Sequence, residues 1–465
     1  MSIDRALILH RFLVSAAHKS SGKTTICIGL VAALKARGRV VQPFKKGPDY
    51  IDPLWLTQAA ARPCRNLDFH LSSHEEIIAQ FSRHGGDADV CIVEGNKGLY
   101  DGLALDGTNS NAALAKLLDL PVILVLDARG MTRGIAPLVL GYQAFDRDIR
   151  IAGVILNRLG GTRHESKLRA VLEHYTDVPV LGAIHENATL ALTERHLGLI
   201  PANETQAAQQ QVSDIADRIA AQVDLDALLN ATQSNRVLSA PPPLPVSTPF
   251  MRVAIAQDAA FGFYYADDLD AFKTAGAELI PFNTLHDAHL PACDALFIGG
   301  GFPECFLDDL EANTSLRTHI HEAIEAGLPT YAECGGLMYL SRSITWKGQT
   351  RQMVGSINAD VVMHEKPVGR GYAVLNPSPE HPWGSPETTD IKAHEFHYSS
   401  LDHLPPDTRF AYTVSRGYGI DGQHDGILHK NLLASYIHLR TSSNYHWPAQ
   451  FLQFARHKGV SSCLQ

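Results

Sequence analysis

The sequence predicts an α/β protein of two domains, each built around a mainly parallel sheet. Short apolar runs alternate with amphipathic segments as far as about residue 229, which is typical of strands separated by helices that cover both faces of a sheet. A stretch rich in proline and small polar residues then interrupts the pattern, and a second strand–helix series begins at Met251. We therefore expect domains over 1–232 and 251–465, joined by a Pro-rich linker over 233–250.

Strands are predicted where apolar runs are short, and helices where apolar residues recur on one face. In the first domain these rules predict strands over 7–14, 40–43, 90–93, 122–126 and 151–156, and helices over 24–37, 111–118 and 165–175. In the second domain they predict strands over 252–258, 278–282, 295–301 and 329–333, and helices over 268–274 and 316–326. The strand character increases after Val354, so we expect additional β-structure there.

The composition excludes several classes of protein. A net charge of −9 over 465 residues argues against a nucleic-acid partner or an anionic membrane surface. No apolar run approaches the roughly 18 residues that a membrane-spanning helix needs. None of the seven cysteines forms a C-x-x-C pair, which argues against a zinc site and favours a reducing compartment over a disulfide framework. We therefore expect a cytoplasmic protein.

Residues 15–25 read SAAHKSSGKTT and end like a phosphate-binding loop. The usual first glycine is replaced by Ala17, but the Gly-Lys-Thr end follows a predicted strand and opens a predicted helix. Backbone N–H groups at such a turn can bind phosphate, Lys23 can reach the β- and γ-phosphates, and the Thr24 hydroxyl can bind Mg²⁺. The alternative is an ordinary Gly-Lys turn before a helix. The nucleotide-binding candidates in this loop are Ser21, Gly22, Lys23, Thr24 and Thr25.

Three further strand ends carry polar side chains that suit a nucleotide site. Lys45 ends the second strand, Glu94 ends the strand over 90–93, and Asn157 ends the strand over 151–156. Ligands of α/β sheets bind at the carboxyl ends of the strands, so Lys45 is a phosphate candidate and Glu94 a magnesium candidate. Asn157 could read a purine edge or cap a turn. A solvated loop for Lys45 and a plain strand-end acid for Glu94 are the alternatives.

In the second domain, an apolar strand leads directly into Cys334, two glycines and a helical pattern. A nucleophile on such a turn is exposed at the edge of the sheet, and the helix N-terminus favours the thiolate. The N–H groups of Gly301 and Gly335 are candidates for an oxyanion hole, and His438 follows a later strand as the candidate base. The alternative is a buried turn of small residues.

Several motifs of the first domain resemble the cobyrinic acid a,c-diamide synthase family. They are KSSGKTT, QPFKKGPDYIDP, EGNKGLYDG, NAALAKLL and RHLGLIPANE. The resemblance implies a P-loop sheet domain like dethiobiotin synthetase, in which ATP phosphorylates a substrate carboxylate and ammonia then displaces the phosphate. It also implies that Mg²⁺ is bound by Thr24, Asp52 and Glu94, and that Tyr50 and Asp101 organise the substrate carboxylate.

The order of Gly-rich loop, Cys334 and His438 resembles class I glutamine amidotransferases. The resemblance implies an α/β glutaminase domain in which the thiol attacks the glutamine amide and releases ammonia. Those enzymes carry His-x-Glu, whereas this chain reads His438-Leu439-Arg440. The cobyrinic and cobyric acid synthase branch also lacks that acid, and the orienting partner of His438 stays open; a backbone carbonyl would suffice.

The resemblance implies glutamine and a tetrapyrrole with a- and c-acetate groups as substrates, and we expect a homodimer. Cobyrinate is the default macrocycle, but AHKSSGKTT, NKGLYDG and DARGMTRG look closer to the sirohaem-amidating relatives of sulfur-oxidising bacteria. Two rival hypotheses remain. One is a nucleotide-switch ATPase with a non-catalytic amidotransferase-like domain, and the other is a pure glutaminase with a regulatory nucleotide domain.

Overall fold

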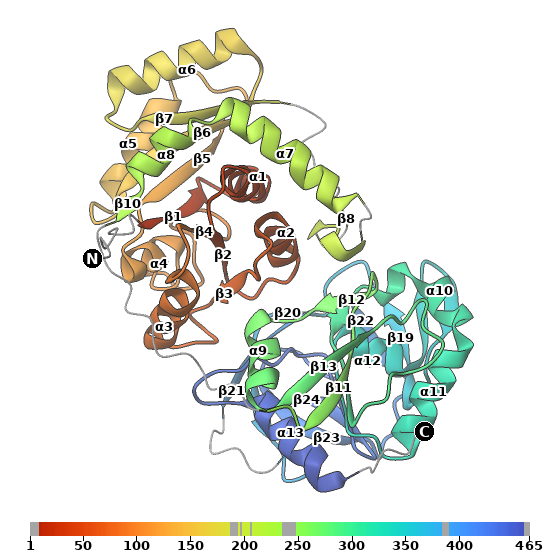
Figure 1. Cartoon of the computed structure of the whole chain (residues 1–465). Helices are drawn as coiled ribbons and strands as arrows, with labels where there is room; N and C mark the ends of the chain where they lie inside the picture. Colours follow the sequence, from red (N-terminus) through yellow and green to blue (C-terminus); the bar gives the residue numbers. More distant parts are fainter. Residues whose placement is uncertain are drawn as a thin grey trace. The chain divides into compact units, whose positions relative to one another are not determined.

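The computed structural model divides the chain into two units, Met1–Pro243 and Leu244–Gln465 (Figure 1). The structure describes residues 9–186, 194–195, 198–204, 207–234, 248–383 and 390–459. Residues 235–247, which make up most of the expected linker, lie outside this part of the chain, as does His196 of the RHLGL motif. None of the described helices is long and apolar enough to cross a membrane.

The first unit is organised around seven parallel strands in the order β3-β2-β4-β1-β5-β6-β7, with β10 antiparallel to β1. Because the seven strands run in one direction, their carboxyl ends meet at one edge of the sheet. The strands are β1 (Leu9–Ala16), β2 (Val41–Lys46), β3 (Arg65–Leu67), β4 (Val90–Glu94), β5 (Val122–Asp127), β6 (Ile151–Leu159), β7 (Val180–His185) and β10 (Gln233–Ser234).

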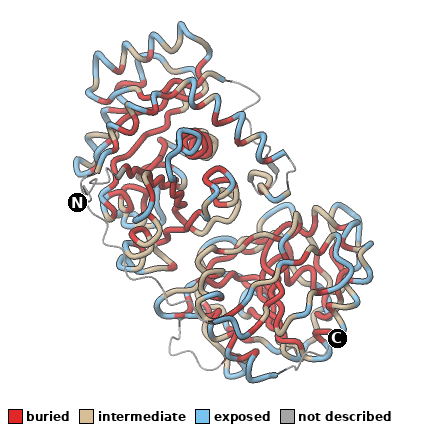
Figure 2. Tube along the Cα trace, in the orientation of Figure 1, coloured by how far each residue is buried: buried red, intermediate tan, exposed pale blue. Residues whose placement is uncertain are grey.

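Helices cover both faces of this sheet and bury an apolar core on each (Figure 2). One face packs against α1 (Lys23–Ala36), α2 (Ile51–Ala60), α7 (Ala208–Gln222) and α8 (Leu225–Ala231). The other packs against α3 (His74–Gly85), α4 (Asn111–Leu118), α5 (Ile135–Phe145) and α6 (Thr162–Tyr175). Short elements complete the unit: β8 (Glu194–Arg195), β9 (Gly198–Leu199) and η2 (Ala202–Glu204). The predicted doubly covered parallel sheet is confirmed.

The second unit contains a mixed sheet in the order β13-β11-β14-β16-β25-β24-β23-β20-β21, parallel as far as β25 and antiparallel beyond it. The parallel strands are β13 (Ala277–Phe282), β11 (Met251–Ala256), β14 (Ala295–Ile298), β16 (Thr330–Glu333) and β25 (Leu432–Ser435). The antiparallel strands are β24 (His424–His429), β23 (Arg409–Arg416), β20 (Gly369–Pro377) and β21 (Ile391–His397). The expected β-structure after Val354 is therefore present.

One face of the mixed sheet packs against α9 (Ala266–Thr274) and α13 (Trp447–Lys458). The other packs against α10 (Leu307–Ala312), α11 (Thr314–Glu325), α12 (Gly335–Leu340) and a smaller sheet. That sheet contains β17 (Ser341–Trp346), β18 (Gln349–Gln352), β19 (Ile357–Met363) and β22 (Ser399–Asp402), and η3 (Pro303–Cys305) precedes α10.

The predicted strand over 295–301 is wrong at its end, because it is two separate strands. β14 stops at Ile298, and β15 (Gly300–Gly301) pairs instead with β12 (Phe261–Phe263). The break lies at Gly299, whose N–H donates to the Tyr264 hydroxyl over 3.0 Å. A Cβ at Gly299 would lie 2.4 Å from the Tyr264 ring, so this approach needs glycine. The bend places a glycine pair beside Cys334.

Candidate functional site

The phosphate-loop candidate joins β1 to α1 and is held from β6. Gly22 caps α1 with φ +87°, and a Cβ at this position would lie 2.3 Å from Asn157 Nδ2. The Asn157 amide donates to the Ser21 carbonyl over 2.9 Å, and Arg158 donates to the Ser20 carbonyl over 2.8 Å. Because only glycine combines this φ with this clearance, the loop conformation depends on Gly22.

Asn157 therefore forms a hydrogen bond with the phosphate loop itself. This agrees with the alternative that Asn157 caps a turn. Its side-chain nitrogen is engaged by Ser21, and its contact with a purine stays a prediction. Within the same loop Ser21 is buried and donates to the His18 carbonyl over 2.8 Å, whereas Thr25 is half-buried. Burial lowers the pKa of Lys23, whose charge lies at the N-terminus of α1.

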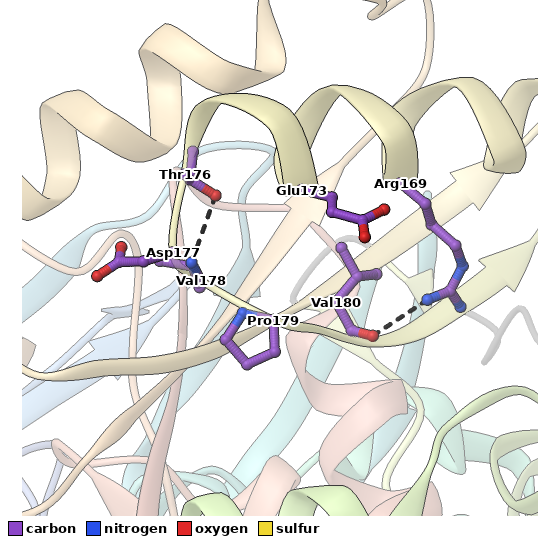
Figure 3. Close-up of a pocket in the computed structure, with 7 residues that line it drawn as sticks. All are labelled: Arg169, Glu173, Thr176, Asp177, Val178, Pro179 and Val180. Atoms are coloured by element: carbon purple, nitrogen blue, oxygen red, sulfur yellow. Dashed lines mark hydrogen bonds between the residues drawn. The ribbon is translucent and has the colours of Figure 1, made fainter.

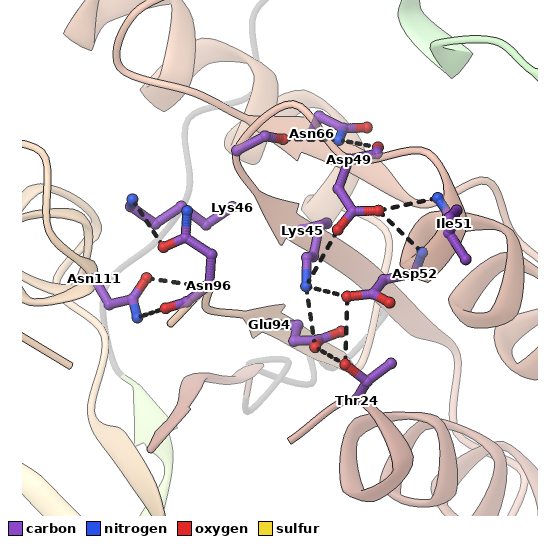
Figure 4. Close-up of polar contacts among 11 residues, drawn as sticks. Thr24, Lys45, Lys46, Asp49, Ile51, Asp52, Asn66, Glu94, Asn96 and Asn111 are labelled. Carbon is purple, nitrogen blue, oxygen red and sulfur yellow. Dashed lines mark hydrogen bonds and ion pairs between the residues drawn. The ribbon is translucent and has the colours of Figure 1, made fainter. Parts of the chain in front are cut away.

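Lys45 lies among three carboxylates at the carboxyl edge of the sheet (Figure 4). Its ammonium contacts Asp52, lies 3.1 Å from Glu94 Oε1 and 3.8 Å from Asp49 Oδ2. The Thr24 hydroxyl donates to Glu94 over 2.6 Å and lies 3.3 Å from Asp52 Oδ2. We call these five residues the carboxylate cluster. The structure thus brings three sequence-predicted candidates, Thr24, Asp52 and Glu94, to one point beside Lys45.

The charges of the cluster depend on one another. Burial alone would lower the pKa of Lys45, but Asp52, Glu94 and Asp49 outweigh it and hold that pKa well above its usual value. Burial raises the pKa of Glu94, and the Lys45 charge opposes that rise. Burial and the nearby Asp52 charge raise the pKa of Asp49 to about 7. Lys45 is therefore the internal counter-ion of an otherwise unfavourable group of carboxylates.

The residues of the cluster fit a magnesium ion. Hydroxyl and carboxylate oxygens are the donors that Mg²⁺ prefers, and it usually takes its remaining ligands from phosphate and water. Glu94 Oε2 is buried and has no hydrogen-bond partner among the described residues, so one oxygen is left for a ligand. Within the described ranges no three His, Cys, Asp or Glu side chains form a metal site by themselves.

The two substrate candidates lie on the segments that follow β2 and β4. Tyr50 is the N-cap residue of α2, next to Asp49. Asp101 is exposed after β4, and its carboxylate accepts from Gly98 N over 2.9 Å. A Cβ on Gly98 would lie 2.7 Å from the Ala17 carbonyl, so the Asp101 turn packs directly against the phosphate loop. The assignment of both residues to substrate binding stays a prediction.

Two buried residues behind these loops are not among the site residues that the sequence predicts. Asn111 is fully buried and donates to Ser15 Oγ over 3.0 Å and to the Gly98 carbonyl over 2.9 Å, which ties the Asp101 turn to β1. Lys46 points to the other side of β2 from Lys45 and donates to Asn96 Oδ1 over 3.3 Å (Figure 4). Burial lowers the pKa of Lys46 to about 8. Only the alternation of side chains along β2 signals that the two lysines differ.

A pocket between α6 and the start of β7 lies away from the phosphate loop (Figure 3). Arg169 crosses it and donates to the Val180 carbonyl over 3.1 Å. Val180 begins β7, so the pocket is at the amino ends of the parallel strands, opposite the edge that carries the phosphate loop. It contains none of the predicted site residues.

In the second unit, Cys334 occupies a strained turn between β16 and α12. Its φ of 47° and ψ of −105° are rare for a residue with a side chain, and its N–H donates to the Ser435 carbonyl over 2.7 Å. The side chain is 8% exposed, so the thiol is enclosed but reachable. Strain of this kind persists only where the surroundings enforce it. The predicted strand-to-helix elbow is present, and the catalytic role of Cys334 stays a prediction.

His438 follows β25, and its imidazole interacts with the Cys334 side chain, which helps to raise the pKa of the imidazole. Its ring stacks on His394 with centroids 4.9 Å apart, and a Cβ on Gly300 would lie 2.8 Å from its Cε1. Its Nδ1 lies 3.3 Å from Glu333 Oε2. Burial would lower the pKa of His438, but the bonds to Cys334 and Glu333 raise it to about 10.

Glu333 is the third residue that sequence reasoning misses. It directly precedes Cys334 in the motif AECGG, whereas the family pattern directs attention to the residues after His438. The signal available is an acid at the last position of an otherwise apolar strand. The register of β16 with β25, which pairs Glu333 with Ser435, brings this acid beside the histidine.

The oxyanion candidates lie side by side next to the elbow. A Cβ on Gly335 would lie 2.9 Å from Gly301 N, and a Cβ on Gly301 would lie 1.9 Å from the Ala260 carbonyl. Both positions therefore exclude larger residues, and both backbones border the turn that carries Cys334. The assignment of their N–H groups to an oxyanion hole stays a prediction.

Comparison with known proteins finds two family models, one matching each of the two units. A model of the CobB/CobQ-like glutamine amidotransferase domain matches residues 252–445, and a model of an AAA domain matches residues 10–193. Cobyrinate a,c-diamide synthase of Magnetococcus marinus is 45% identical over 97% of this chain and 98% of that protein. The protein of the same name from Methanosarcina acetivorans is 42% identical over 92% of each chain, and that of Listeria monocytogenes serotype 4b is 41% identical over 94% of this chain and 97% of its own. The chain therefore belongs to the cobyrinate a,c-diamide synthase family.

Proposed function

We propose that this chain is an ATP- and glutamine-dependent ligase that amidates the a- and c-acetate carboxylates of a cobyrinate-type tetrapyrrole. The observation that carries the proposal is the presence of two complete sets of residues on one chain. The phosphate loop lies beside the carboxylate cluster in the first unit, and the Cys334 side chain interacts with the His438 imidazole in the second. The relatives of the same name support the choice of macrocycle.

In the first unit the task is to turn a carboxylate into a better acyl donor. The substrate carboxylate attacks the γ-phosphorus of ATP, ADP leaves, and an acyl phosphate forms. Ammonia then attacks the acyl carbon, inorganic phosphate leaves, and the amide remains. Lys23 and the N–H groups of the loop bind the phosphates, and Thr24, Asp52 and Glu94 hold Mg²⁺, which when bound neutralises phosphate charge. Tyr50 and Asp101 border the place of the acceptor.

In the second unit the task is to release ammonia from glutamine. Cys334 Sγ attacks the carboxamide carbon while His438 holds the thiol proton and returns it to the departing ammonia. Water then hydrolyses the thioester to glutamate. The N–H groups of Gly301 and Gly335 stabilise the oxyanion formed in each step.

The central metal and exact macrocycle are tested directly by mass. The protein is incubated with glutamine, ATP-Mg²⁺ and either cobyrinate or a sirohaem-type tetrapyrrole, and each product is weighed. Every acid converted to an amide replaces OH by NH₂. We expect two conversions on cobyrinate. Two conversions on the sirohaem-type macrocycle alone would assign the chain to sirohaem-amidating relatives, and none on either would refute the ligase proposal.

The same samples separate the rival functions. A nucleotide-switch ATPase would dimerise on ATP without amidating either macrocycle, and a pure glutaminase would release glutamate without tetrapyrrole-dependent phosphate. We propose that the enzyme works as a homodimer in the cytoplasm, and the dimer is checked by light scattering with and without ATP.

A further inference from the structure

The position that carries the orienting acid in His-x-Glu amidotransferases is occupied here by a base with other contacts. Arg440 Nη2 donates to Asp267 over 3.1 Å, and its guanidinium lies 4.9 Å from the centroid of the Tyr265 ring. Arg440 is 3% exposed, so these contacts fix it in the interior. A guanidinium cation cannot accept a hydrogen bond from an imidazole N–H. The His438 imidazole therefore needs an acceptor from another residue.

Glu333 supplies a carboxylate at the required atom. Its Oε2 lies 3.3 Å from His438 Nδ1, and its Oε1 accepts from Leu439 N over 2.9 Å and from the Tyr331 hydroxyl over 2.7 Å. Glu333 is itself only 3% exposed. Two donors therefore fix one oxygen and leave the other directed at the imidazole, which is how a positioning carboxylate has to be held.

Three other residues that border the imidazole, His394, Gly300 and Cys334, carry no carboxylate. His394 stacks on one face of the His438 ring and contacts the Tyr265 hydroxyl through its own Nδ1 over 3.2 Å. Gly300 borders Cε1. Cys334 is the group on which the base acts. Of the titratable side chains in these contacts, Glu333 is the carboxylate, and it faces Nδ1 of the ring.

We propose that Glu333 is the positioning residue of the glutaminase reaction and replaces the missing acid of the His-x-Glu pattern. This inference rests on the proposed glutaminase function of the second unit. The carboxylate accepts a hydrogen bond from Nδ1–H, which fixes the ring and leaves Nε2 to face the Cys334 sulfur. The orienting acid is thus the residue before the nucleophile, at the end of β16. In the His-x-Glu pattern the acid instead follows the histidine.

The proton balance needs no further group. Sγ bonds to the carboxamide carbon while its proton lies on Nε2, and Glu333 stabilises the imidazolium. When the carbon–nitrogen bond breaks, the same proton passes to the leaving ammonia. Water then attacks the thioester and gives a proton to Nε2, and the carbon–sulfur bond breaks to restore the starting pair. Glu333 neither gives nor takes a proton in these steps.

The test is Glu333→Gln, which keeps the size of the side chain and removes its charge. We expect glutamine-dependent kcat to fall by on the order of 10²- to 10⁴-fold, with the KM for glutamine and the ammonium-dependent amidation unchanged. The alkaline limb of the glutamine-dependent pH profile should move to lower pH, because the carboxylate is one cause of the raised pKa of His438. A purely structural role would not move that limb.

Two further variants keep the result interpretable. Glu333→Asp retains the charge and should recover part of the lost kcat, and it carries the test if the glutamine variant does not fold. Tyr331→Phe removes one donor to Glu333 and leaves the imidazole contact, so its effect should be much smaller. Folding is read from melting temperature and ammonium-dependent activity.

The outcomes separate this inference from the proposed function. Wild-type glutamine kcat and an unshifted pH profile in folded Glu333→Gln would overturn the role of Glu333, while leaving the glutaminase intact. Glutamine hydrolysis by Cys334→Ala at the wild-type rate would overturn the glutaminase itself.

Discussion

Lys45 and Lys46 are consecutive and both buried, but the same substitution should destabilise the protein much more at Lys45 than at Lys46. Lys45 is 4% exposed and contacts Asp52, Glu94 and Asp49, so Lys45→Met leaves the carboxylates without their counter-ion. Breaking a buried ion pair on one side costs about 3–5 kcal/mol, and we expect this loss in the free energy of unfolding of the first unit. Amidation should cease, whereas glutamine hydrolysis, which belongs to the second unit, should continue.

Lys46→Met is the matched control. Lys46 donates to the Asn96 amide oxygen over 3.3 Å and lies 5.9 Å from the centroid of the Phe69 ring, and burial lowers its pKa to about 8. Its charged form is already disfavoured, so a methionine of similar length should change stability by less than about 1 kcal/mol. The difference in unfolding free energy between the two variants therefore measures the contribution of the carboxylate cluster, and not the effect of burying a lysine.

The pH dependence of Lys45→Met has a definite sign. Burial already raises the pKa of Glu94 and of Asp49, the latter to about 7, and removing Lys45 raises both further. A group whose pKa is raised by folding stabilises the fold at low pH and loses that contribution as pH rises through the folded value. The deficit of Lys45→Met should thus shrink as pH falls below about 7. Added Mg²⁺ should stabilise this variant more than wild type, because the ion replaces the lost charge.

The assay is calorimetry of wild type and both variants across this pH range, with and without ATP-Mg²⁺. The reasoning is refuted if the two substitutions destabilise the first unit equally, or if the deficit of Lys45→Met grows as pH falls.

The remaining predictions concern glycines and one imidazole. Gly300→Ala should reduce glutamine hydrolysis at least tenfold, because its Cβ would lie 2.8 Å from His438 Cε1, whereas Gly134→Ala, with nothing within 4 Å, should not; equal activities would contradict this. Gly22→Ala and Asn157→Ala should each weaken ATP binding. The double variant should lose less binding free energy than the sum of the two, because the Cβ at Gly22 would lie 2.3 Å from the Asn157 amide. Calorimetric titration measures these losses, and additive losses would contradict the role of this contact. With the pKa of His438 raised to about 10, its contribution to stability should be complete below pH 6.5 and lost as pH rises through about 10; a melting temperature that rises over this range would exclude it.

Local patterns predict the elements whose periodicity or turn chemistry is strong. The strand before the phosphate loop and the helix after it follow from one apolar run and one Gly-Lys-Thr turn, and parallel topology brings Lys45 and Glu94 together. The helix α3 is not predicted above, although Ser73 and Glu76 form a capping box that the sequence carries. The sequence therefore contains a local signal for the start of this helix.

Contacts between distant strands could not be predicted in the same way. Glu333 and His438 meet because β16 and β25 are neighbours in one register, and a shift of one residue would turn the acid to the other face. The break at Gly299 depends on the Tyr264 hydroxyl, which no local pattern around residue 299 reveals. Tertiary packing decides both features.

The central claim is that one chain carries a glutaminase and a separate ATP-dependent amidating site. The most direct test is the Cys334→Ala variant, supplied with cobyrinate and ATP-Mg²⁺ and either glutamine or an ammonium salt, with the product weighed. We predict diamide from ammonium and none from glutamine. Diamide from glutamine at the wild-type rate, or none from ammonium in the folded variant, would contradict the account.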